Sequence, residues 1–206
     1  MTRVIAYVDC FNLYYGLRAA YKRRYYWLDL VALASNLLKT SQVLSHTHYF
    51  TSRIRSSGTN SADRQRQSVY LDALRARPGL TLHQGHFLEK SATCHQCGAT
   101  WATHEEKTTD VNIAVQLLTD AFDDLFDTAL VISGDSDLTT PVRRVRERFP
   151  AKRVIVAFPP RRHSSALSAA ASGYLTISEN NLRQSLLPDL VVAAPGLEFH
   201  RPPTWR

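Results

Sequence analysis

Four aspartates lie beside strongly apolar segments, at positions where a chain typically turns or begins a helix. They are Asp9, Asp110, Asp135 and Asp137. Asp9 follows the apolar run 4–8, and the last two aspartates follow the apolar run 130–132. A carboxylate just past the carboxyl end of a buried strand lies where open α/β sheets bind ligands. Carboxylates that meet raise each other's pKa unless a hard cation lies between them, so we expect a Mg²⁺ or Mn²⁺ site that acts on phosphodiesters.

The elements around these aspartates indicate an α/β fold. Strands are expected at 3–8, 44–51, 80–88, 128–133, 153–158 and 174–177, and helices at 28–39, 62–76, 110–122, 138–148 and 164–171. Alternation of this kind predicts a parallel sheet covered on both faces. If the first strand is central and the fourth lies beside it, Asp9 meets Asp135 and Asp137 at the switch point of the sheet. Asp110, in the first turn of its helix, then points into the same crevice.

Composition and charge are those of one soluble domain with a polyanionic partner. The 206 residues are 44% hydrophobic and 21% charged, with a formal net charge of +7. Such a charge favours a nucleic-acid partner, although a basic surface can also serve solubility alone. The sequence contains no apolar stretch near the roughly 20 residues of a membrane helix, and the run 4–8 is too short for a signal peptide. We therefore expect a cytoplasmic protein without membrane association.

Three ordered segments resemble the NYN family, in the LabA-like branch of the PIN-like nucleases. They are 9–15, 106–111 and 133–138, and the resemblance extends to the Cys94/Cys97 region and to 181–189. It implies a Rossmann-like three-layer α/β/α sandwich with a mainly parallel sheet, and divalent-metal-dependent cleavage of RNA. By motif, Asp9, Asp110, Asp135 and Asp137 match the acidic set, and Asn12 matches the asparagine of the first loop. We expect a nuclease domain over 1–190, with a cysteine-containing insert at about 89–106, and a C-terminal extension over 191–206.

The insert carries Cys94 and Cys97 with a two-residue gap, which is half of a zinc knuckle. Nearby histidines at 83, 86, 95 and 104 could complete four ligands of a structural Zn²⁺. The alternative is a hairpin turn with two reduced thiols. In either case we expect the insert to hold the loop that leads into Asp110.

Basic residues near the expected strand ends are candidates for holding a substrate. The segment 22–27 mixes cations with aromatic residues, as single-stranded nucleic-acid sites do. The same residue types also occur in cores and on solvated surfaces. We expect substrate contacts from Arg23, Arg24, Arg53, Arg55 and Lys107.

Other functions remain open at this point. The residues do not distinguish RNA from DNA, although the resemblance favours an endoribonuclease, and a homo-oligomer is among the alternatives. A non-catalytic RNA-binding or scaffold protein would keep the basic surface but would not need four carboxylates. A haloacid-dehalogenase-like phosphatase needs a second aspartate two residues after the first, where this chain has Phe11.

Overall fold

A computed structural model describes residues 1–54, 61–93 and 96–205, without the side chains of 86–92 and 101–107. Its centre is a six-stranded sheet in the order β3-β2-β1-β6-β7-β8. All the neighbouring strands of this sheet pair in parallel. The strands are β1 (Thr2–Asp9), β2 (Gln42–Thr51), β3 (Leu80–Gln84), β6 (Thr128–Ile132), β7 (Arg153–Phe158) and β8 (Gly173–Thr176). The predicted parallel sheet, with the first strand central and beside 128–132, is confirmed.

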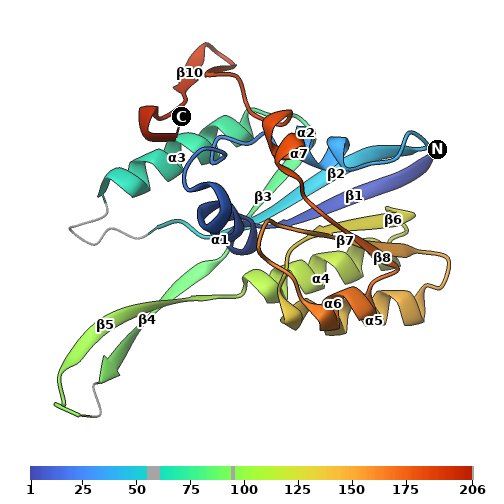
Figure 1. Cartoon of the computed structure of the whole chain (residues 1–206), viewed down its shortest axis with the longest axis horizontal. Coiled ribbons are helices and arrows are strands. Elements are labelled where there is room, and N and C mark those ends of the chain that lie inside the picture. Colours follow the sequence, from blue (N-terminus) through green and yellow to red (C-terminus); the bar gives the residue numbers. More distant parts are fainter. Residues whose placement is uncertain (55–60, 94–95, 206) are drawn as a thin grey trace.

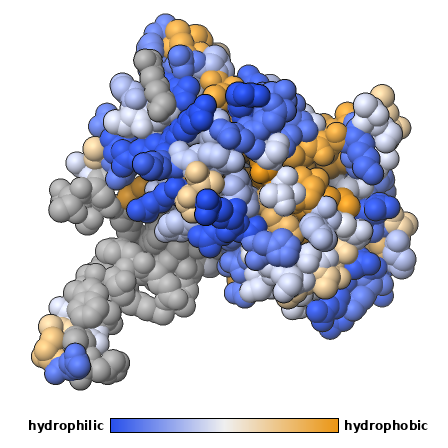
Figure 2. All heavy atoms as spheres, in the orientation of Figure 1, coloured by the Kyte–Doolittle hydropathy of each residue, from blue (hydrophilic) through white to orange (hydrophobic). Residues whose placement is uncertain are grey.

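Helices cover both faces of this sheet (Figure 1). One face packs on α1 (Cys10–Tyr21), α2 (Leu30–Asn36), α3 (Ser61–Arg75) and α7 (Glu179–Arg183). The other face packs on α4 (Thr109–Phe122), α5 (Thr139–Arg148) and α6 (Ser165–Ala170). Successive side chains of β1 alternate between the two cores, since Val4 belongs to the first core and Ile5 to the second. Figure 2 shows hydrophobic residues between two mostly hydrophilic layers, as a three-layer α/β/α sandwich requires.

Two antiparallel hairpins are added to the sandwich. Strands β4 (His86–Thr93) and β5 (Thr100–Lys107) pair along their whole length and project away from the sheet (Figure 1). Strands β9 (Leu190–Ala193) and β10 (Leu197–His200) lie beside α3, and a 3₁₀ turn (Pro203–Trp205) follows them. Trp205 is buried and its ring centroid lies 6.4 Å from that of Trp27. In the described part of the chain, no helix is long and apolar enough to cross a membrane.

The sequence predictions were wrong about several elements, and α7, β9 and β10 were among those not expected. Helix α1 was not expected, and Asn12, predicted in a loop, lies in its first turn. The single strand predicted at 80–88 is two strands, because the chain leaves the sheet at Gly85, whose N–H donates to the Thr51 carbonyl at 2.8 Å. Strand β5 was also missed, since its pairing partner is the extension of the chain beyond that break. Helix α1 has aromatic residues of modest helix propensity, so capping and tertiary packing decide its conformation.

Candidate metal centre

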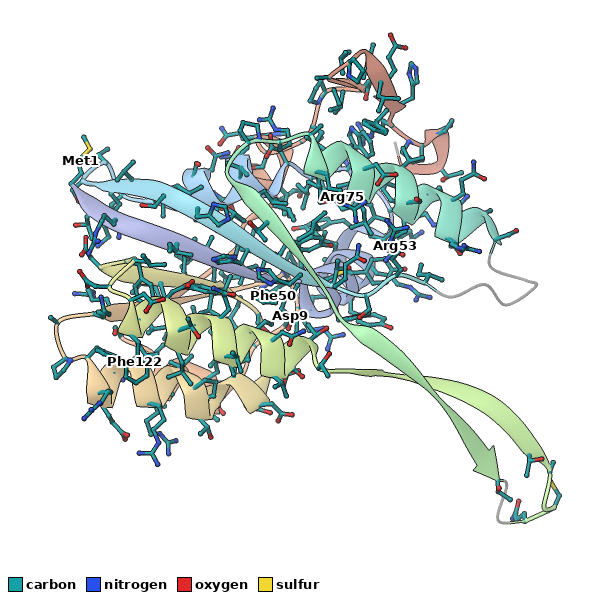
Figure 3. The ribbon with its side chains drawn as sticks, turned by 180° about the vertical axis from the view of Figure 1, so that it is seen from behind. Met1, Asp9, Phe50, Arg53, Arg75 and Phe122 are labelled. Carbon is teal, nitrogen blue, oxygen red and sulfur yellow. The ribbon has the colours of Figure 1, made fainter. Side chains whose placement is uncertain are left out.

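Three of the four predicted aspartates converge at the carboxyl edge of the sheet. Asp9, Asp110 and Asp135 each offer an oxygen, and these oxygens all lie within 4.8 Å of one another. Asp9 ends β1, Asp135 follows β6, and Asp110 lies in the first turn of α4. Figure 3 shows Asp9 on the side of the molecule from which the β4–β5 hairpin projects, far from Met1.

The topology of the chain explains this convergence. Val8 of β1 pairs with Ile132 of β6, so the residues that follow both strands emerge side by side. Asp110 arrives from the opposite direction, because β5 brings the chain back from the hairpin into α4. Thr108 makes that turn with a φ of 88°, which a residue with a side chain rarely adopts, and its side chain makes no capping hydrogen bond. The side chain of Thr108 therefore does not cap α4.

Asp9 is the most enclosed carboxylate of the group, with 2% of its surface exposed. One oxygen accepts the Asn12 backbone N–H at 3.1 Å. The other accepts the Asn12 side-chain amide at 2.7 Å and the Ser133 hydroxyl at 2.8 Å. Burial raises the pKa of Asp9, these hydrogen bonds oppose the increase, and the charge of Asp135 adds to it. A cation beside Asp9 would favour its charged form.

Asn12 and Ser133 hold Asp9 and Asp135 in one network. The Asn12 amide also reaches Asp135 Oδ2 at 3.4 Å, while Asn12 Oδ1 accepts the Gly134 N–H at 3.3 Å. The Ser133 hydroxyl accepts the Asp135 N–H at 3.0 Å. Sequence reasoning missed Ser133, although its place between a buried strand and a Gly-Asp turn was a signal.

The fourth predicted aspartate has a different position. Asp137 is exposed and lies outside the group of three. Its backbone N–H donates to Asp135 Oδ1 at 3.0 Å, so this residue helps to orient Asp135 through its main chain.

The chemistry of the three converging side chains fits a hard divalent cation. Mg²⁺ is usually bound by one or two carboxylates and keeps several waters, and Mn²⁺ accepts similar oxygen ligands. Asp9, Asp110 and Asp135 supply such oxygens without a softer ligand among them. The donors from Asn12 and Ser133 hold two of the carboxylates in place, as the supporting contacts of metal sites do.

The predicted substrate-binding cations occupy different surroundings. Arg23 lines a pocket beside α1, whereas Arg24 lies 3.1 Å from Glu179 in an exposed ion pair. Arg53 is exposed just after β2 (Figure 3). Lys107 ends β5, but its side chain lies outside the description, as does the whole of Arg55.

One further arginine lies close to the acidic centre. The Arg162 side chain packs against Gly134, where an added Cβ would lie 2.9 Å from that of Arg162. Its guanidinium carbon lies 5.6 Å from the ring centroid of Tyr15, a cation–π distance. The backbone and Cβ of Arg162 thus lie beside the turn that carries Asp135, and its guanidinium lies near Tyr15.

The cysteine insert is partly described. Thr93 and Thr100 pair at the end of the hairpin, and Cys97 lies between them as an exposed free thiol. Cys94 lies outside the described residues. His83, one of the candidate zinc ligands, lies in the main sheet, where its ring nitrogen is 2.9 Å from that of His48. A zinc site in the insert stays a prediction.

Comparisons with known proteins bear on the fold and the family. A curated relative, 6-hydroxy-3-succinoylpyridine 3-monooxygenase of Pseudomonas putida, is 26% identical over 178 residues, which cover 70% of this chain. The chain spans about half of that relative's length, 55%. A crystal structure of a protein of unknown function from Vibrio parahaemolyticus has a TM-score of 0.56 and 23% identity, covering 90% of this chain and 96% of the other.

The family assignment rests on a match that covers most of the chain. The model of the NYN domain matches residues 3–179, which include all three segments that carry the converging carboxylates. This family has a nuclease-type, PIN-like fold, in agreement with the parallel α/β/α sandwich described above. The chain belongs to the NYN domain family.

Proposed function

We propose that this protein is a Mg²⁺- or Mn²⁺-dependent ribonuclease whose metal site is formed by Asp9, Asp110 and Asp135. The observation that carries the proposal is the convergence of these three carboxylates within 4.8 Å at the carboxyl edge of a parallel sheet. One of them is almost fully buried, which is costly for a fold unless a cation or proton offsets the charge. Membership of the NYN family supports a nuclease over a passive acidic cluster.

Each residue has a role in this proposal. Asp9, Asp110 and Asp135 would hold the divalent cation, which when bound would activate water near neutral pH and offset charge on the phosphate oxygens. The Asn12 amide donates to Asp9 and reaches Asp135, and so keeps these two carboxylates in position. Asp137 acts through its backbone bond to Asp135. Arg162, beside the Gly134 turn, is suited to bind a phosphate oxygen.

RNA is the preferred substrate class in this proposal. The net charge of +7 favours a polyanion, and exposed Arg53 and pocket-lining Arg23 supply cations near the strand ends. The preference for RNA over DNA follows from the family alone. A nuclease that acts on DNA, and a protein that binds RNA without cleaving it, are the alternatives that an assay must separate.

The name of the curated relative denotes a monooxygenase that acts on a substituted pyridine. The ligand types in this chain favour hydrolysis instead. Non-haem iron oxygenases typically use two histidines and one carboxylate, whereas the converging residues here are three aspartates. Hard oxygen ligands suit Mg²⁺ or Mn²⁺ and phosphodiester chemistry.

Incubation with labelled single-stranded RNA and DNA of the same sequence tests the proposal. Parallel reactions contain Mg²⁺, Mn²⁺ or EDTA. We expect cleavage of RNA with a divalent metal and none with EDTA. Cleavage of DNA alone would replace the proposed substrate, and tight RNA binding without cleavage would favour the non-catalytic alternative. Undiminished cleavage in EDTA would contradict the metal site.

A further inference from the structure

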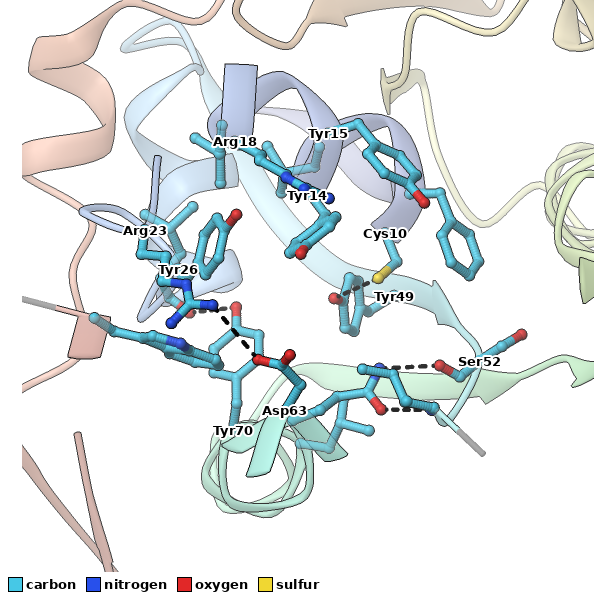
Figure 4. A pocket seen from close by; sticks show the side chains of 18 of the residues that line it. Cys10, Tyr14, Tyr15, Arg18, Arg23, Tyr26, Tyr49, Ser52, Asp63 and Tyr70 are labelled. Carbon is cyan, nitrogen blue, oxygen red and sulfur yellow. Dashed lines mark hydrogen bonds and ion pairs between the residues drawn. The ribbon is translucent and has the colours of Figure 1, made fainter. Parts of the chain in front are cut away.

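A pocket of about 660 Å³ lies beside the acidic centre, on the α1 face of the sheet (Figure 4). Its walls come from α1, the segment 22–28, the end of β2, α3 and the C-terminal turn. The volume falls within the range of small-molecule sites in proteins, roughly 300–1,000 Å³. None of the three converging aspartates is among the described residues that line it.

Aromatic rings line much of the pocket. Tyr14 is 38% exposed and its ring centroid lies 5.0 Å from that of Tyr26. Tyr26 in turn contacts Trp205 edge to face, with centroids 5.5 Å apart. Trp205 and Tyr70 are buried and contact each other at 5.8 Å. A planar ligand that enters the pocket therefore meets the accessible Tyr14 ring. Tyr14 packs on Tyr26, which in turn packs on the buried Trp205.

Cations outnumber carboxylates around the rings. Among the described residues that line the pocket, Arg18, Lys22 and Arg23 are cationic and Asp63 is the one acid. The nearest Arg23 nitrogen lies 3.8 Å from Asp63 (Figure 4). Asp63 also accepts a much closer contact from Arg66. The carboxylate is thus shared, and the pocket keeps an excess of positive charge. Aromatic surface with positive charge is the combination that binds single-stranded nucleic acid.

One residue that lines the pocket is the chain neighbour of a residue of the acidic centre. Cys10 lines the pocket and directly follows Asp9 in the chain. Residues 10, 14 and 18 lie on one face of α1, so the lining extends roughly 12 Å along the helix at 1.5 Å per residue. A polynucleotide with one phosphate at the carboxylates can place a neighbouring nucleotide in the pocket.

We propose that this pocket takes one unpaired nucleotide of the substrate strand, with its base against Tyr14 and its backbone phosphate near Arg18 and Arg23. This inference rests on the proposed nuclease function. It assigns a preference for single strands, because a base inside a duplex has to leave its stack and its pairing partner before it enters a pocket. The stacked base then holds the adjacent phosphodiester over Asp9, Asp110 and Asp135.

Binding measured without metal tests the pocket separately from cleavage. The dissociation constant of a labelled single-stranded hexanucleotide RNA is compared with that of the same strand in a duplex, by fluorescence anisotropy in EDTA. We expect weaker binding of the duplex. Tyr14→Ala should weaken single-strand binding about tenfold or more, since a base–aromatic stack is typically worth that factor. Tyr14→Phe should retain binding because it keeps the ring.

Tyr174→Ala is the matched control, because Tyr174 is 60% exposed on β8, which lies at the opposite edge of the sheet from β3. It should bind as the wild type does. Arg18→Gln should lower the slope of affinity against salt by about one charge. Melting temperatures confirm that each variant is folded.

Three results of these binding measurements would overturn the pocket assignment. They are unchanged affinity in folded Tyr14→Ala, equal affinity for duplex and single strand, and displacement of the RNA by a small aromatic carboxylate such as nicotinate at lower concentrations than by a mononucleotide. Single-strand binding that depends on Tyr14 but occurs without metal-dependent cleavage would keep the pocket and reject the nuclease. Metal-dependent RNA cleavage that Tyr14→Ala does not reduce would support the nuclease function and reject the pocket.

Discussion

Replacing Ser133 by alanine tests how the fold stabilises the charge of its acidic centre. Ser133 is fully buried, and its hydroxyl donates to Asp9 at 2.8 Å and accepts the Asp135 N–H at 3.0 Å. Loss of a hydrogen bond to a charged group costs about 1.5–3 kcal/mol, and an unpaired buried amide adds about 1 kcal/mol. We therefore expect Ser133→Ala to lower the free energy of unfolding by about 2–4 kcal/mol when Asp9 is ionised.

This loss should depend on pH. Burial raises the pKa of Asp9 above its ordinary value of 3.8, and removal of the Ser133 donor, which favours the carboxylate, should raise it further. At pH values between the pKa of Asp9 in the folded wild type and its higher pKa in the folded variant, the folded variant binds more protons than the folded wild type. The stability of the variant therefore falls more steeply as pH rises through that window. The difference in the free energy of unfolding between the wild type and the variant is therefore smallest below this pH window and largest above it.

Urea unfolding followed by circular dichroism, in EDTA from about pH 4 to pH 9, measures this difference. Ser136→Ala is the matched control, because Ser136 is an exposed serine of the same turn. It should change stability by less than about 0.5 kcal/mol at every pH. A loss in Ser133→Ala that is equal across the pH range, or no loss at all, would refute the reasoning about Asp9.

Two further substitutions test the packing that positions the site. Gly16→Ala adds a Cβ 2.7 Å from the Pro160 carbonyl oxygen. Although alanine has the better helix propensity, we expect the free energy of unfolding to fall by about 1–3 kcal/mol. Urea unfolding measures this loss, and an unchanged midpoint would contradict the contact. Tyr7→Phe removes a buried hydroxyl that donates to Asp120 at 2.7 Å, which should cost about 1.5–3 kcal/mol and lower the melting temperature by about 3–12 °C. A melting temperature within about 1 °C of the wild type would refute that estimate.

Much of the sandwich could be predicted from hydrophobic pattern. Strands such as Thr128–Ile132 and Arg153–Phe158 are continuous apolar runs because helices cover both of their faces. Helix α1 could not be predicted in this way. Its conformation depends on the Asp9 cap and on the close approach of Gly16 to the loop after β7, and neither is visible as periodicity.

The acidic centre was partly predictable for the same reasons. Asp9 and Asp135 follow adjacent strands, so a correct strand order brings them together. The placement of Asp110 depends on the β4–β5 hairpin, whose second strand carried no recognised signal. Ser133 and the pocket around Tyr14 depend on side-chain contacts between distant segments, such as that of Tyr26 with Trp205. Such contacts follow from the fold and not from local sequence.

The rate of RNA cleavage by the Asp135→Asn variant tests most directly the central claim, that Asp9, Asp110 and Asp135 form a catalytic metal centre. This substitution keeps the size of the side chain and removes one of the three converging charges. With labelled single-stranded RNA and Mn²⁺, we expect the rate to fall by about a hundredfold or more, with little change in melting temperature. Asp123→Asn, at an exposed aspartate just after α4, is the control and should cleave like the wild type. Full cleavage by folded Asp135→Asn would contradict the assignment of the metal centre.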